Sequence, residues 1–336
     1  MKRLKKYINQ NEWYLMGIIL IYSIIVTTQN SGFFTLENFF DVLKGSSGMI
    51  ILAMGILVVL LSGGIDLSFT AIAMFGGYSA ARLMMATKID NLAFAFVVSA
   101  VIGILLGAVN ALIIHKFHLP TMIATLGTSS LFSGIMTTFI GTKTITVGMM
   151  PKSLRAFGGF RLFEMVNDAG STYGLTVFII PVVIVVVVTW FILYKTMLGR
   201  GVIALGNSEE AAKRSGFNLF WIRMFIYTYV GLLAGIMGVI YVAEVNSVYA
   251  VALYGTELTY IAAVVIGGAK LTGGEGKILG TLLGVIIVRL LNSTLVFLGL
   301  TSSWNGFFTG AVLLFSVGLT SYMSRLRSRR NLTFTD

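Results

Sequence analysis

The chain has 336 residues, of which 57% are hydrophobic and only 11% are charged, and its net charge is +11 at pH 7. Soluble domains are about 45–50% apolar and about 25% charged, so the composition excludes a soluble catalytic domain and indicates a polytopic α-helical membrane protein. The chain has no cysteine, which excludes disulfides and thiolate metal sites. In a membrane chain, excess Lys and Arg indicates cytoplasmic loops better than it indicates nucleic-acid binding.

Ten apolar stretches follow one another along the chain, and we expect each to form a membrane-spanning α-helix, because about 20 apolar residues cross a hydrocarbon layer of about 30 Å. "MKRLKKY" before the first stretch is similar to the start of a signal peptide, but no small-residue cleavage pattern follows, so we expect a retained first helix. The second and third stretches are separated only by "LSGGIDLS", and the eighth is short for a full crossing. The expected spans are 13–31, 46–61, 67–86, 92–114, 120–140, 173–195, 221–243, 257–269, 277–299 and 304–323.

Positive charge predicts the orientation of these spans. If the N-terminus is cytoplasmic, most Lys and Arg residues fall in cytoplasmic loops, as the positive-inside rule requires, and both termini face the cytoplasm. We therefore expect one transmembrane domain over residues 1–336, with half one at about 13–140 and half two at about 173–323. The loop 141–172 would lie outside the cell, and the loop 196–220 would lie in the cytoplasm.

The segment between the second and third spans holds an isolated carboxylate, Asp66. An ionised carboxylate in hydrocarbon costs at least about 2.5–3.5 kcal/mol, so it is not expected to face lipid. In one interpretation Gly63 and Gly64 end span two, and Asp66 or Ser68 accepts hydrogen bonds from the first N–H groups of span three. In the other interpretation Asp66 contacts the solute or carries protons. The two remain open, since a capped half-helix can also line a cavity.

An internal repeat connects this segment with the eighth span. "GIDLSFTAIAMFGG" at 64–77 aligns without gaps with "GTELTYIAAVVIGG" at 255–268, and "GILLGAVNALI" from Gly103 is similar to "GTLLGVIIVRL" from Gly280. The copies are five spans apart, an odd number, so they are expected to have opposite orientations. Inverted repeats with glycine-interrupted segments at matching positions are typical of transporters and indicate the pathway. The repeat pairs Asp66 with Glu257, Ser68 with Thr259, and Phe69 with Tyr260. In the capping interpretation, Glu257 and Thr259 would cap span eight as Asp66 and Ser68 cap span three.

Few other polar groups occur within the predicted spans. Arg289 is the most notable, because an arginine in the middle of a span normally faces the interior of the bundle, in a structural ion pair, in hydrogen bonds to helix ends, or along a pathway. The scarcity of charge favours a neutral polar solute and argues against a proton relay. Asn305 is a further polar residue within a predicted span. The candidates for the translocation pathway or for helix caps are Gly63, Gly64, Asp66, Ser68, Phe69, Asn110, Glu257, Thr259, Tyr260, Arg289 and Asn292.

The stretch "NSEEAAKRSG" in the loop 196–220 predicts one short cytoplasmic helix. We expect Asn207 to cap its start, with Glu210 three residues later as in a capping box, and Gly216 to occupy the C′ position after its end. A long loop with a well-capped helix is expected to bind a partner, and a solvated connector is the alternative.

Three stretches together resemble a known family. "EEAAKRSG" is similar to the E-A-A-x-x-x-G coupling motif of ABC importer permeases. With "LSGGIDLS", "LGRGVIALGNSEEAAKRSG" and "IAAVVIGGAKLTGGEGKILGTLLG", nearly the whole chain resembles the ribose-type permeases of carbohydrate ABC importers. The usual small Val-Gly after "GIDLS" is replaced by Phe69 and Thr70, so the resemblance does not identify the solute. The residues that the resemblance implies in coupling to an ATPase are Asn207, Ser208, Glu209, Glu210, Ala211, Ala212 and Gly216.

The resemblance implies a ten-span permease of the bacterial inner (plasma) membrane, with both termini in the cytoplasm. It implies as partners a second permease subunit, either a copy or a homologue, a cytoplasmic ATPase subunit that uses ATP and Mg²⁺, and an extracytoplasmic sugar-binding protein, within membrane lipid and without nucleic acid. The expected function is import of a monosaccharide or a similar small neutral polyol by alternating access.

The chain itself is not expected to be an enzyme or to hold a cofactor. It has no G-x-x-x-x-G-K-[ST] sequence with which to bind ATP phosphates. No catalytic constellation emerges, and His115 and His118 have no nearby Cys, Asp or Glu with which to bind a metal. The alternative function is an ion-coupled secondary transporter or a channel that acts without an ATPase.

Overall fold

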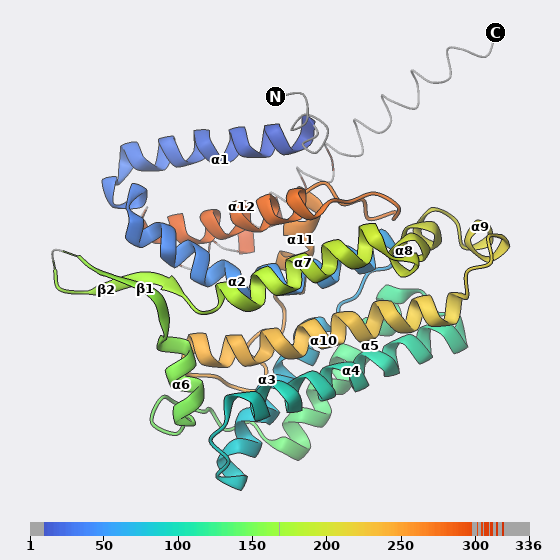
Figure 1. Ribbon diagram of the computed structural model, residues 1–336, viewed down its shortest axis with the longest axis horizontal. Coiled ribbons are helices and arrows are strands. Elements are labelled where there is room, and N and C mark those ends of the chain that lie inside the picture. Colours follow the sequence, from blue (N-terminus) through green and yellow to red (C-terminus); the bar gives the residue numbers. More distant parts are fainter. Residues whose placement is uncertain are drawn as a thin grey trace.

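A computed structural model describes residues 10–167 and 169–297, together with positions 301, 304, 306–308, 310, 311, 314 and 318. Helices dominate the described part of the chain (Figure 1). In chain order the elements are α1 (Gln10–Gln29), the 3₁₀-helix η2 (Ser31–Phe34), α2 (Leu36–Leu61), α3 (Phe69–Thr87), α4 (Leu92–Phe117), α5 (Thr121–Ile135), which continues in the π-helix η3 (Met136–Ile140), α6 (Lys152–Gly159), β1 (Arg161–Val166), β2 (Thr172–Thr176), α7 (Ile179–Lys195), α8 (Met197–Asn207), α9 (Glu209–Arg214), α10 (Leu219–Val245), α11 (Glu257–Ile266) and α12 (Ile278–Phe297).

The all-α polytopic class is confirmed, whereas the number of ten spans is not. Among the described residues, six helices are long and apolar enough to cross a membrane, or seven if the pair α7 and α8, bent by 72°, is one span. The 19-residue α3 is not one of them, and α11 has only 10 residues. Both helices have buried faces that pack against other helices, so neither needs the uniformly apolar surface of a lipid-exposed span. The expected span 304–323 falls mostly outside the described residues.

Two long helices, α2 and α10, form the centre of the bundle. Figure 1 shows α1 and α12 on one side of them and α3, α4 and α5 on the other. In its most apolar window α2 is 83% buried and α10 is 72% buried, whereas the peripheral α1 and α4 are 17% and 22% buried. The order of burial follows from these positions, because the central helices bury most of their surface against protein and the outer helices leave theirs to lipid.

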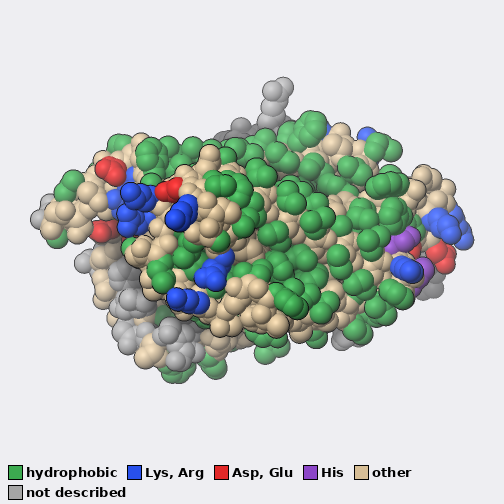
Figure 2. Space-filling model, turned by 90° about the horizontal axis from the view of Figure 1, so that it is seen from below, with side chains coloured by type: hydrophobic (Ala, Val, Ile, Leu, Met, Phe, Trp, Pro, Cys, Tyr) green, Lys and Arg blue, Asp and Glu red, His purple; other side chains and the backbone are tan. Residues whose placement is uncertain are grey.

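Charged side chains gather at the two ends of the molecule and leave an apolar belt between them (Figure 2). One end carries α6 and the β1–β2 hairpin, and the other carries α9 (Figure 1). Large apolar side chains such as Leu20 of α1, Leu105 of α4 and Val187 of α7 are exposed on the belt. An apolar band of this kind is what the hydrocarbon of a bilayer covers, so the distribution identifies a multi-pass membrane protein.

The packing repeats between the two halves. In the first half α3 and α4 pack on α10, and in the second half α11 and α12 pack on α2. Within each half the helix pair meets through a glycine. A Cβ built on Gly76 of α3 would lie 2.4 Å from the hydroxyl of Ser99, and one on Gly267, after α11, would lie 2.5 Å from the carbonyl oxygen of Gly280. These matching contacts support the repeat, and the opposite orientation of the copies stays a prediction.

Three segments contain more structure than the sequence predicted. The loop 141–172 contains α6 and β1, which pairs antiparallel with β2, and the loop 196–220 contains the amphipathic helix α8 before α9. Helix α2 begins at Leu36, ten residues before the predicted start at residue 46. The reason is local, because the Thr35 hydroxyl accepts a hydrogen bond from the N–H of Asn38 at 3.2 Å and caps the earlier start.

Candidate functional site

Helix α2 ends in a Schellman motif that turns the chain into an extended segment, residues 64–68. The N–H of Gly63 donates to the carbonyl of Leu60 at 2.9 Å, and the N–H of Gly64 donates to the carbonyl of Val59 at 3.2 Å. Gly63 has a φ of +78°, a conformation that costs glycine little. The predicted ending of span two by these two glycines is therefore confirmed.

Two threonines of α5 hold the extended segment in place. The Thr121 hydroxyl accepts a hydrogen bond from the N–H of Ile65 at 2.9 Å, and the Thr125 hydroxyl accepts one from the N–H of Leu67 at 3.0 Å. Backbone groups outside a helix need such partners when water is absent. Sequence analysis did not identify Thr121 and Thr125, because their role depends on the packing of α5 against a distant segment.

Valine in place of Thr125 is expected to destabilise the protein by about 1–3 kcal/mol, because the N–H of Leu67 would lose its buried acceptor. Valine at Thr121 is expected to cost less, since Thr121 borders a cavity from which water can reach the N–H of Ile65. Serine at Thr125 keeps the hydroxyl and serves as the control. Thermal unfolding in detergent measures the order, and equal stability of Thr125→Val and Thr125→Ser would contradict this assignment.

Asp66 lies in the middle of the extended segment, 4% exposed, and its carboxylate binds Ser68, the residue before the first turn of α3. Its Oδ1 accepts hydrogen bonds from the N–H of Ser68 at 2.7 Å and from the Ser68 hydroxyl at 2.6 Å. The hydroxyl in turn accepts one from Nδ2 of Asn110 in α4 at 2.7 Å. Ser68 is the N-cap residue of α3, yet its side chain makes no capping bond. The predicted cap is thus confirmed for Asp66, which accepts a hydrogen bond from the N–H of the N-cap residue, and wrong for Ser68, whose hydroxyl is used in a bond network with α4.

Glu257 also fails to cap its helix. Its Oε1 accepts hydrogen bonds from the N–H of Gly255, before α11, at 3.2 Å, and from the hydroxyl of Thr70 in α3 at 2.6 Å. Thr256 is the N-cap of α11 and makes no side-chain capping bond, and Thr259 lies within the first turn without capping it. The predicted cap by Glu257 and Thr259 is wrong, because the carboxylate faces the other half of the molecule.

The starts of α3 and α11 therefore meet. Besides the bond between Thr70 and Glu257, the rings of Phe69 and Tyr260 pack edge to face with their centroids 5.8 Å apart. Phe69 and Thr70 are the two residues that depart from the family pattern, so the departure lies at this contact. Three residues that the repeat had identified, Phe69, Glu257 and Tyr260, thus lie together in the structure. Their fourth partner, Thr70, was not among the predicted site residues.

The meeting point lies halfway along the bundle. On one side of it Gly64 approaches the Tyr227 hydroxyl of α10, and on the other side Ala73 lies against Gly238 of the same helix. The start of α3 therefore lies between these levels, near the middle of the 27-residue α10. Two helix starts, each with the positive end of a helix dipole, face one another at this depth.

Arg289 and Asn292 are both on α12, and Arg289 interacts electrostatically with Tyr260 at the start of α11. The guanidinium of Arg289 reaches across to α2, where a Cβ built on Gly45 would lie 1.9 Å from its Nη2. Arg289 and Lys44 interact electrostatically with Glu244 of α10. Glu244 and Lys44 were missed because each lies close to the end of a predicted span. Arg289 thus connects the start of α11 with Glu244 and Lys44, whereas nothing in the described contacts brings Asn292 to the meeting helix starts. Asn305 is outside the described residues.

At the other end of the bundle, α9 is the predicted cytoplasmic helix, with one correction. Ser208 is its N-cap, and the Ser208 hydroxyl accepts a hydrogen bond from the N–H of Ala211 at 3.2 Å. The prediction that Asn207 caps the helix, with Glu210 completing a capping box, is wrong, because Asn207 is the last residue of α8. Gly216 has a φ of +84° and occupies the predicted C′ position.

The first two acidic residues of α9 have different surroundings. Glu209 forms an ion pair with Arg223 of α10, at 2.7 Å, and the other guanidinium nitrogen of Arg223 lies 3.3 Å from Nδ1 of His115 in α4. The side chain of Glu210 is 85% exposed and has only the exposed Arg214 nearby, at 3.7 Å. Glu209 therefore fastens α9 to the bundle, while Glu210 points outward.

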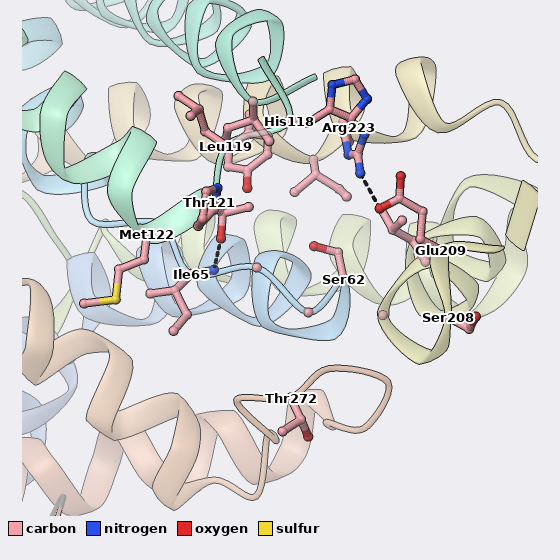
Figure 3. Close-up of a pocket in the computed structure, with 18 residues that line it drawn as sticks. Ser62, Ile65, His118, Leu119, Thr121, Met122, Ser208, Glu209, Arg223 and Thr272 are labelled. Carbon is pink, nitrogen blue, oxygen red and sulfur yellow. Dashed lines mark hydrogen bonds and ion pairs between the residues drawn. The ribbon is translucent and has the colours of Figure 1, made fainter. Parts of the chain in front are cut away.

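A cavity of about 630 Å³ lies between the start of the extended segment after α2 and the start of α9 (Figure 3). Its walls come from the end of α2, the turn between α4 and α5, the end of α8, the start of α9 and the first turns of α10. Polar groups from several elements face it, including Ser62, Thr121, Glu209 and Arg223. Space next to α9 is thus continuous with the segment that leads to Asp66.

Comparison with known proteins places the chain in a family. Residues 38–317 match the family described as "Branched-chain amino acid transport system / permease component". The ribose import permease protein RbsC of Escherichia coli (strain K12) is 34% identical over 299 residues, which cover 89% of this chain and 90% of the relative. RbsC of Haemophilus influenzae (strain ATCC 51907 / DSM 11121 / KW20 / Rd) is 33% identical over 319 residues, 95% of each chain.

A second kind of relative is named for a different solute. The autoinducer 2 import system permease protein LsrC of Yersinia pseudotuberculosis serotype O:1b (strain IP 31758) is 29% identical over 314 residues, which cover 93% of this chain and 84% of the relative. No solved structure matches the chain. The predicted resemblance to ribose-type ABC permeases is confirmed by these relatives.

Proposed function

This chain belongs to the family of permease components matched above, and we propose that it is the transmembrane subunit of an ATP-driven importer for a monosaccharide or a similar small neutral polyol. The solute class comes from the relatives, which are named for ribose and for autoinducer 2. The pathway residues proposed here run from the end of α2 to the meeting helix starts, with Asn110 and Arg289 beside them: Gly63, Gly64, Asp66, Ser68, Phe69, Thr70, Asn110, Glu257, Thr259, Tyr260 and Arg289.

One observation carries the proposal, the bond between Thr70 and Glu257 at the middle of the bundle. It joins the starts of two glycine-interrupted helices from the two halves, the arrangement that transporters with inverted repeats use around a solute site. Hydroxyl, amide and phenol groups predominate there, and these suit the hydroxyls of a neutral polyol. Rocking of the two halves would break this hydrogen bond and would open the solute site to each side of the membrane in turn.

Energy would enter through α9. A separate cytoplasmic ATPase, with its own ATP and Mg²⁺, would bind the exposed face of this helix, and an extracytoplasmic binding protein would select the solute. A second permease subunit would complete the transporter, and both termini would face the cytoplasm. The exposure of Glu210 supports this partner role, since its ion pair with Arg214 is exposed and weak, and no other interaction of its side chain is seen among the described residues.

Assembly and stimulated hydrolysis test the proposal together. The tagged permease is produced together with candidate ATPase and binding-protein subunits of the same genome, extracted in mild detergent, and assayed with ribose as the first of a panel of neutral polyols. We expect the ATPase to co-purify, and its hydrolysis of MgATP to rise with the loaded binding protein. A permease that purifies alone and transports in response to a sodium or proton gradient would support the alternative, a secondary transporter or channel.

A further inference from the structure

Three segments from distant parts of the chain touch through backbone alone at the end of the bundle that carries α9. They are Leu61–Gly63 at the end of α2, Gly206 in the last turn of α8, and Gly273–Gly274 between α11 and α12. The N–H of Gly274 donates a hydrogen bond to the carbonyl of Leu61 at 3.0 Å. We name these three segments the glycine junction.

No side chain fits between the segments. A Cβ built on Gly206 would lie 1.9 Å from the carbonyl oxygen of Leu61 and 2.8 Å from the nitrogen of Gly274. A Cβ on Gly273 would lie 2.7 Å from the Cα of Gly63. These neighbours are backbone atoms, which cannot move aside as the end of a flexible side chain can. A displacement of one segment is therefore passed to the other two with little slack.

The junction connects the coupling segment with both halves of the repeat. Gly206 precedes the N-cap of α9, Ser208, by two residues. Leu61–Gly63 leads directly into the extended segment and Asp66, and Gly273–Gly274 follows the end of α11. The end of α2 and the loop after α11 thus both contact, through backbone atoms, the segment that precedes α9. Both contacts are at Gly206.

The surroundings leave this connection stiffer than the other attachments of α9. On the side of α10, the ion pair between Glu209 and Arg223 is half-exposed at Glu209, and the cavity of about 630 Å³ lies beside it. Side chains that line a cavity can change position more easily than packed backbone can. A force on α9 is therefore passed to the ends of α2 and α11 through packed backbone, in addition to its passage to α10 through the residues 215–218.

We infer that the glycine junction moves as one rigid unit and transmits the movement of α9 to the ends of α2 and α11. Gly206 is its positioning residue. The inference rests on the proposed function, since it assigns a route for the energy that the ATPase would supply. It predicts that disturbing the junction separates hydrolysis from transport, whereas disturbing an ordinary packing contact lowers both together.

The first test replaces Gly206 with alanine in the full complex with its ATPase and binding protein. We expect assembly and ATP hydrolysis to persist, and uptake of labelled ribose per ATP hydrolysed to fall by about fivefold or more, as for a typical coupling between sites. Gly17→Ala in α1 is the matched control, because a Cβ at Gly17 meets nothing within 4 Å. An unchanged ratio of uptake to hydrolysis in Gly206→Ala would overturn the inference.

A second test does not depend on the stability of Gly206→Ala. Gly273→Ala disturbs the junction from the side of α11, because its Cβ would lie 2.7 Å from the carbonyl oxygen of Gly206. Gly170→Ala is the matched control, since Gly170 also has a positive φ, +78°, but its Cβ meets nothing within 4 Å. We expect uptake per ATP hydrolysed to fall in Gly273→Ala and not in Gly170→Ala, and equal ratios in the two variants would overturn the inference. If the wild-type complex shows no ATP-dependent uptake at all, the proposed function fails instead.

Discussion

Leucine in place of Asp66 is expected to abolish solute uptake, whereas asparagine is expected to preserve most of it. The leucine side chain has no acceptor, so the N–H and hydroxyl of Ser68 would lose the partner that they have at 2.7 and 2.6 Å. Each buried donor without a partner costs about 1–3 kcal/mol. The loss would also release the Ser68 hydroxyl from its position beside Asn110 and disorder the start of α3.

Asparagine has an oxygen at the same position as Oδ1 of Asp66 and can accept both bonds without a charge. The measurement is uptake of labelled solute by cells in which both variants are present in the membrane at the wild-type level. Loss of uptake in Asp66→Asn at normal expression would contradict a structural role for the carboxylate. It would favour the other interpretation, in which the charge of Asp66 binds solute or carries a proton.

Valine in place of Gly216 is expected to remove coupling to the ATPase while the chain still inserts into the membrane. Gly216 has a φ of +84°, which a β-branched residue rarely adopts, so valine would unwind the end of α9. A Cβ at Gly216 meets nothing within 4 Å, so the effect would come from the backbone conformation rather than from a clash. Asparagine tolerates this conformation, and Gly216→Asn is therefore the matched control.

Alanine in place of Glu210 should give the same loss without disturbing the helix. Its exposed pair with Arg214 contributes little to stability, since surface ion pairs are worth about 0–1 kcal/mol. Uptake and stimulation of ATP hydrolysis are measured for both variants, beside the amount of permease in the membrane. Normal uptake in Glu210→Ala and Gly216→Val would contradict the assignment of α9 as the coupling helix.

Local chemistry allowed the helix ends to be predicted from the sequence. The glycines at positions 63 and 216 lie in left-handed conformations directly after α2 and α9, where a C′ glycine is expected. The start of α9 was misplaced by one residue because Asn207 and Ser208 are both good caps, and the choice depends on how far α8 continues. That continuation is set by the packing of α8 on α2 and α10, which a local pattern does not contain.

The partners of buried polar groups depended on tertiary structure. Asp66 and Ser68 have the composition of a cap, yet Asn110 of α4 draws the Ser68 hydroxyl into a different network. Glu257 was expected to serve its own helix and instead accepts a bond from Thr70, 187 residues earlier in the chain. The repeat did predict that these two segments are related, because their identical spacing of acid, hydroxyl and aromatic residues survives in the sequence. It did not predict that they touch.

Transport in reconstituted vesicles tests most directly whether this permease imports its solute with energy from ATP. The permease and its ATPase are placed in lipid vesicles loaded with MgATP, with the binding protein and labelled solute outside, and uptake is measured with and without ionophores that dissipate sodium and proton gradients. For an ATP-driven importer we expect uptake that requires internal ATP and the ATPase, and that continues when the ionophores are present. Uptake by the permease alone, driven by an ion gradient, abolished by the ionophores and indifferent to ATP, would contradict it.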